Sequence, residues 1–144
     1  MGSPSGANGG TVPTDITLAG EAVDDPAITN NIVRGLQMIT YPFSADIDIQ
    51  ATDFANDGAN KGTAKGSLKA DKISLWDSRP RPDGQKFKIY GLNEDNKWHD
   101  VGNWSGPFAS NVVISMGQGF WYRCYTNGFP WSETNKYLEN LRKP

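Results

Sequence analysis

Hydrophobic and polar residues alternate in short runs along this chain, as the side chains of half-buried β-strands do. Most runs end near Gly, Pro, Asn or Asp, the residues that favour turns. We therefore predict strands at DITLAGEAV (15–23), IVRGLQMITYPF (32–43), DKISLWD (71–77), KFKIYGL (86–92) and GQGFWYRCYT (117–126).

The residues between these runs predict how the strands are connected. The runs 71–77 and 86–92 flank a turn with Asp83-Gly84 at its tip, which predicts a hairpin. Residues 24–31 are predicted to be a turn-rich linker, and residues 44–54 a short strand or one helical turn. With about eight or nine short strands at close spacing, we expect an all-β fold, an antiparallel sandwich or a barrel-like structure.

The run 117–126 carries large rings on both of its faces. Alternation places Phe120 and Tyr122 on the face toward the core, and Trp121 and Arg123 on the opposite face. A surface strand needs only one apolar face. The second face must therefore be covered by the chain itself, by a sugar, or by another copy of the protein.

Composition limits the classes of function. The 144 residues include 16 Gly and 9 Pro, and 11% are aromatic, which favours strands over helices. The net charge of -2 speaks against a nucleic-acid partner, and no apolar stretch is long enough to span a bilayer. Cys124 is the only cysteine, so no internal disulfide forms, and we expect it to be a small buried hydrophobic residue.

The chain length suggests one β domain over residues 15–144, preceded by an arm. Residues 1–14 are rich in Gly, Ser and Pro and are predicted to be a flexible arm that becomes ordered only through a contact. The first ten residues contain no apolar segment of the kind found in signal peptides. This start fits a signal that has been removed or a protein made without one.

The sequence offers little for catalysis. His99 is the only histidine, and its neighbour Asp100 would point to the opposite face of a strand, so we expect an exposed or partly stacked side chain and no triad. Asp46, Asp48 and Asp53 could bind calcium or act as an acid–base pair, but a solvated face is the simpler interpretation. We predict no enzyme activity, no metal site and no cofactor.

Glycine-rich and acidic segments also fail as known motifs. Counted as a calcium loop from Asp53, the chain has Ala55 at the third position and Ala64 at the twelfth, where acidic residues are needed. GANKGTAKGS (58–67) lacks the spacing of a phosphate-binding loop, so we interpret it as a turn.

Tryptophan is the strongest functional signal, because all five tryptophans of the chain lie in the segment from Trp76 to Trp131. We expect some in the core and one or two at an interaction surface, because exposed aromatic patches usually mark such surfaces. The predicted subunit or glycan contacts are Trp98, Trp104, Trp121, Arg123, Trp131 and Tyr137.

Four phrases occur together in order: GLQMITYPF (35–43), ISLWD (73–77), FKIYG with KWHDV (87–101), and ISMGQGFWYR followed by WSET (114–134). Over about residues 30 to 137 the chain resembles small β-rich modules of large secreted or surface proteins from verrucomicrobial and lentisphaeral bacteria. It departs from that pattern at Gln37, where Asn is expected. The resemblance implies a surface or structural role and no catalytic residue.

Two functions follow from these observations. The first is a structural subunit of an extracellular filament, surface layer or virion, which forms a homo-oligomer or polymer through aromatic surface and the N-terminal arm. The second is a carbohydrate-binding module. Its stacking platform would be Trp98, Trp104 and Trp131, and its polar partners Asp100, Asn103 and Arg123.

Overall fold

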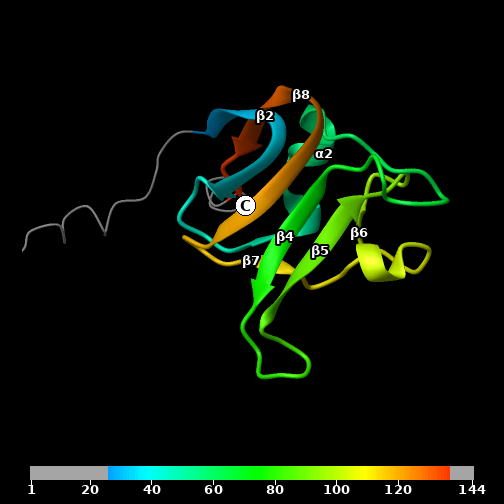
Figure 1. Cartoon of the computed structure of the whole chain (residues 1–144). Coiled ribbons are helices and arrows are strands. Elements are labelled where there is room, and N and C mark those ends of the chain that lie inside the picture. Colours follow the sequence, from blue (N-terminus) through cyan, green and yellow to red (C-terminus); the bar gives the residue numbers. More distant parts are fainter. Residues whose placement is uncertain (1–25, 137–144) are drawn as a thin grey trace, which may run out of the picture.

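The computed structural model describes residues 26–136, which form two antiparallel sheets (Figure 1). The larger sheet has the strand order β2-β8-β4-β5-β6, and the smaller pairs β3 with β7. The strands are β2 (Ala27–Thr40), β3 (Ile47–Asp48), β4 (Lys72–Asp77), β5 (Lys86–Leu92), β6 (Trp98–Asp100), β7 (Val113–Ile114) and β8 (Gly119–Thr134). The prediction of an all-β, antiparallel, sandwich-like fold is confirmed.

Three short helical segments complete the described part of the chain. They are η1 (Ile49–Ala51), α2 (Phe54–Asp57) and η2 (Val101–Asn103). The arm 1–14, the predicted strand 15–23 and Tyr137 lie outside the described residues.

β2 begins five residues before the predicted strand 32–43, and β8 extends eight residues beyond the predicted strand 117–126. β2 has 14 residues and β8 has 16. The predicted linker at 24–31 is wrong from Ala27 onward, because Ala27 to Asn31 pair with Thr134 to Pro130. Proline is tolerated at position 130 because β8 pairs there with β2 alone.

A sharp bend divides the β2–β8 ribbon into two halves (Figure 1). The register shifts between Val33 and Gly35, where φ of Gly35 is 97°. Opposite, Gly128 has φ of 108°, and a Cβ there would lie 2.3 Å from the carbonyl oxygen of Ile32. The Gln37 side chain closes the bend, since its Nε2 donates to the Val33 oxygen at 2.8 Å and its Oε1 accepts from the Val33 nitrogen at 3.2 Å.

The hairpin predicted from residues 71–92 is confirmed. β4 and β5 are antiparallel, with Asp77 opposite Lys86 and Lys72 opposite Gly91. Alternation along β4 buries Ile73 and Leu75, so Ser74 and Trp76 point to the other face of the sheet.

The hydrophobic core lies on one side of the five-stranded sheet, beneath the β3–β7 pair, η1 and α2. Phe54 of α2 is fully buried and stacks on Trp131, with ring centroids 4.3 Å apart, and it contacts Tyr122 at 4.6 Å. The predicted core positions Phe120, Tyr122 and Cys124 are all buried. The opposite side of the sheet has no comparable layer among the described residues.

Candidate functional site

The open side of the large sheet carries a cluster of exposed hydrophobic side chains. All of them lie on four adjacent strands, β2, β8, β4 and β5. Five of these side chains are between 41% and 52% exposed, and Trp121 between them is partly buried. We call this surface the outer patch, and it comprises Leu36, Met38, Trp76, Phe87, Ile89 and Trp121.

Strand register brings these residues into rows across the sheet. One row runs Met38, Trp121, Ser74, Ile89, because each is the Cα partner of the next. Trp76 is the partner of Phe87 in the neighbouring row, and their rings meet edge to face at 5.1 Å. The outer patch is therefore continuous and not a set of isolated side chains.

The row on the other side of Trp121 is cationic. Arg123 is the Cα partner of both Leu36 and Lys72. Burial, and then the charge of Arg123, lower the pKa of Lys72. The Lys72 ammonium donates to the Ser67 and Ala70 carbonyl oxygens at 2.7 and 3.2 Å. Within residues 26–136 neither cation has a salt bridge.

Trp104 covers the β5–β6 end of this face. A Cβ on Gly91 would lie 3.0 Å from the Trp104 ring, and the indole Nε1 donates to the Thr63 oxygen at 2.7 Å. Trp104 therefore keeps a partly exposed ring in a fixed orientation. His99 lies beside it, with ring centroids 5.8 Å apart, and is held to Asp95 at 2.7 Å. The stacking of His99 was predicted, but the side chain is buried and not exposed.

The structure separates the five predicted contact residues that it describes. Trp121 and Arg123 lie in or beside the outer patch, and Trp104 at its margin. The prediction for Trp98 and Trp131 is wrong, since both are 1% exposed. They face α2 and pack around Phe54, which fills the space that a ligand would need.

The tryptophan platform proposed for a glycan is therefore absent, because two of its three rings are in the core. Its polar partners also point elsewhere. Asp100 caps η2 by accepting from the Gly102 nitrogen at 2.8 Å, and its other oxygen lies 3.3 Å from the Lys88 ammonium. Arg123 lies on the outer face of β8, whereas Asp100 lies on β6, which is three places away from β8 in the strand order.

Sequence reasoning missed Trp76, Phe87 and Ile89 as surface residues. The signal was present, because alternation sets Trp76 opposite Ile73 and Leu75. What alternation does not reveal is which of the two faces the rest of the chain covers.

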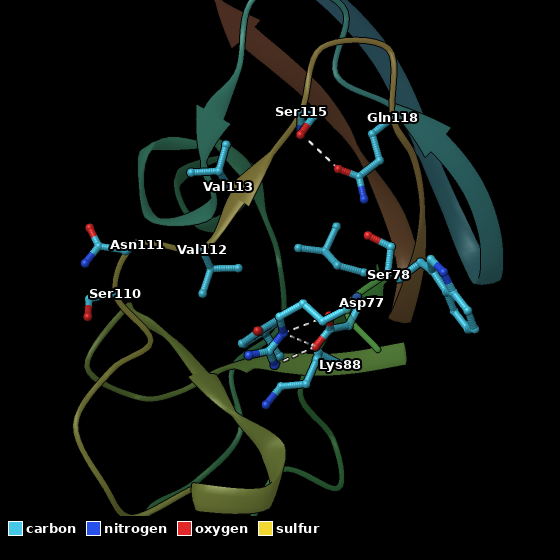
Figure 2. A pocket seen from close by; sticks show the side chains of 13 residues that line it. Asp77, Ser78, Lys88, Ser110, Asn111, Val112, Val113, Ser115 and Gln118 are labelled. Atoms are coloured by element: carbon cyan, nitrogen blue, oxygen red, sulfur yellow. Dashed lines mark hydrogen bonds and ion pairs between the residues drawn. The ribbon is translucent and has the colours of Figure 1, made fainter. Parts of the chain in front are cut away.

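A second feature is an open groove of about 790 Å³ between the end of β4 and residues 110–118 (Figure 2). Figure 2 shows Ser115 and Gln118 on one side of it and Asp77 and Lys88 on the other. The Gln118 Oε1 accepts from the Ser115 nitrogen at 2.9 Å, while its amide nitrogen points into the groove.

Charge in the groove is largely paired. Hydrogen bonds from the side chain and then the backbone of Arg79 lower the pKa of Asp77 to about 2. The guanidinium Nη2 of Arg79 lies 2.7 Å from Asp77 Oδ2. The groove thus offers hydroxyl and amide groups beside an internal ion pair, which suits an uncharged polar ligand.

Within residues 26–136, no three His, Cys, Asp or Glu side chains converge as a metal site would require. The carboxylates weighed for calcium serve three different backbone nitrogens. Asp46 accepts from Met116, Asp48 from Gln50 and Asp53 from Thr134. In the same part of the chain, no helix has the length and apolar character to cross a bilayer.

No family model, curated protein or solved structure matches the chain. The outer patch and the groove are the two features of the described residues that bear on function.

Proposed function

We propose that the chain is a non-enzymatic structural module that associates with further copies of itself through the outer patch. One observation carries this proposal: a continuous patch of large hydrophobic side chains lies exposed on the face of the sheet that the described residues leave uncovered. Monomeric soluble proteins rarely expose contiguous apolar surface of this kind unless it is an interaction site.

The size of the outer patch supports association. Five side chains about half exposed present roughly 500 Å² of apolar surface, judged from the areas that large side chains bury. Two copies joined face to face would then cover roughly 1,000 Å², the lower end of specific protein interfaces. The resemblance to modules of bacterial surface proteins favours an extracellular filament or surface layer, and a virion is the alternative.

Removing the exposed ring pair tests the proposal. Because Trp76 and Phe87 are nearly half exposed, replacing both with Ser should leave the fold intact and abolish association. Light scattering of W76S/F87S should give the 15.8 kDa monomer at concentrations where the wild type is larger. Leu68→Ser is the matched control, since Leu68 is 84% exposed in a loop outside the outer patch. Equal masses for the wild type and the double variant would contradict the proposal.

A second candidate function is glycan binding in the groove of Figure 2. The observation that favours it is the set of polar groups on its walls, which includes Ser78, Ser110, Asn111, Ser115 and Gln118.

Titration of neutral oligosaccharides by calorimetry tests this second function. Binding that is lost in Gln118→Ala and kept in Leu68→Ser would support it. Absence of heat with every oligosaccharide at millimolar concentration would remove it.

A further inference from the structure

We infer that the outer patch pairs with the outer patch of a second copy about a two-fold axis that runs along the row Met38, Trp121, Ser74, Ile89. This inference rests on the proposed function, and it specifies the partner and its orientation. Such an axis lies between the two sheets and across their strands. It sets each strand over the same strand of the other copy, running in the opposite direction.

β8 shows the first sign that the face complements itself. Arg123 and Gly119 each lie two residues from Trp121, on opposite sides of the axis. Gly119 carries no side chain on this face, and the Met38 Sδ lies 3.0 Å from the point where a Gly119 Cβ would be, so the surface here is low and lined by the Met38 thioether. The two-fold operation places the long Arg123 side chain of each copy over Gly119 and the Met38 thioether of the other.

β4 repeats the pattern with a charge and a ring. Lys72 and Trp76 each lie two residues from Ser74. Pairing brings the Lys72–Arg123 end of one sheet over the Trp76–Phe87 end of the other. Cations over the face of Trp or Phe are attracted by the ring quadrupole, most strongly where water is excluded. The Lys72 ammonium already donates to two backbone oxygens, but neither cation has a salt bridge within residues 26–136, so the rings would add an electrostatic contact to both.

β5 completes the match. Gly91 and Phe87 each lie two residues from Ile89, and the Trp104 ring covers Gly91. Phe87 of one copy would then meet Trp104 of the other, ring against ring. The pairing therefore sets Arg123 over Gly119 on β8, Lys72 over Trp76 on β4, and Phe87 against Trp104 on β5. The residues of the central row pack against the same residues of the other copy.

A partner of another kind would have no reason to share this symmetry. The match between the two ends of the patch holds only for a copy turned by the two-fold axis. Two sheets stacked this way lie about 10 Å apart and are rotated by roughly 30°. In that geometry the central rows of the two copies stay directly opposite each other, although the edges of the two sheets move apart.

Cross-linking tests the axis directly. In Ser74→Cys the two thiols would face each other across the axis, so a bis-maleimide of about 10 Å span should convert the protein to a covalent dimer. Thr40→Cys is the matched control on the same face. The axis separates the two Thr40 positions by about 14 Å along the strands as well as by the gap between sheets. Wild type should not react, because Cys124 is only 2% exposed.

Two outcomes separate this inference from the proposed function. Association of the wild type together with cross-linking of Thr40→Cys, but not of Ser74→Cys, would overturn the two-fold axis and leave the proposed function standing. A wild type that stays monomeric would overturn both. As a second readout, Arg123→Ala should weaken pairing roughly tenfold, while Arg34→Ala, which removes a cation from the bend, should not. Equal affinities for these two variants would contradict the cation–ring contact.

Discussion

The Glu133 side chain lies in the core, where a few close hydrogen bonds fix its position. Its side chain is fully buried, and Oε2 accepts from the Trp131 indole at 2.7 Å and from the Asp53 nitrogen at 2.8 Å. Oε1 has no hydrogen-bond partner within the described residues. Burial raises the pKa of Glu133 to about 7, which favours the protonated carboxyl in the folded protein.

This carboxyl should make stability depend on pH. Its pKa is higher in the folded state than the ordinary 4.5, so its stabilising effect is full below pH 4.5 and is lost as the pH rises toward 7. Urea unfolding of the wild type should therefore give about 2 to 3 kcal/mol less stability at pH 8 than at pH 5 from this group. Glu133→Gln should lack that part of the decrease. Parallel pH profiles for the two proteins would contradict the assignment.

At the scale of elements, the bend in the two-stranded β2–β8 ribbon lets β8 pack against α2 along one half and pair with β4 along the other. It depends on two glycines with positive φ, Gly35 and Gly128, and on the Gln37 amide that bridges the Val33 backbone. The Gln37 side chain thus stabilises the bend through its two hydrogen bonds to the Val33 backbone.

Substitution of Gly128 should disturb the bend strongly. An alanine Cβ would lie 2.3 Å from the Ile32 oxygen in a backbone conformation that disfavours side chains, so Gly128→Ala should cost about 2 kcal/mol or more. Gly66→Ala is the control, because a Cβ there meets nothing within 4 Å. Thermal unfolding compares the two variants, and similar melting temperatures would contradict this account of the bend.

The sequence pattern predicted the strands better than it predicted their surroundings. Alternation gave the two faces of β4 and β8 correctly, since Ile73, Phe120 and Tyr122 are all buried. It failed for Trp98 and Trp131, whose burial depends on Phe54, a residue distant in sequence from both. Which face of a strand is covered is a property of the whole fold. The two-residue alternation along a strand does not reveal which face the rest of the chain covers.

At the scale of the whole molecule, residues 26–136 cover one face of the five-stranded sheet and leave the other face open and apolar. A two-fold contact through the outer patch closes on a pair, so a filament or layer needs an additional contact. The arm 1–14 was predicted to supply one, and it lies outside the described residues. The outer patch is accordingly proposed as the first contact of an assembly.

Sedimentation equilibrium of the wild-type protein over a wide concentration range tests the central claim most directly. We predict an apparent mass that rises with concentration from 15.8 kDa to at least twice that value, as the outer patch becomes covered. A mass that stays at 15.8 kDa up to millimolar protein would contradict the claim that another copy covers this face.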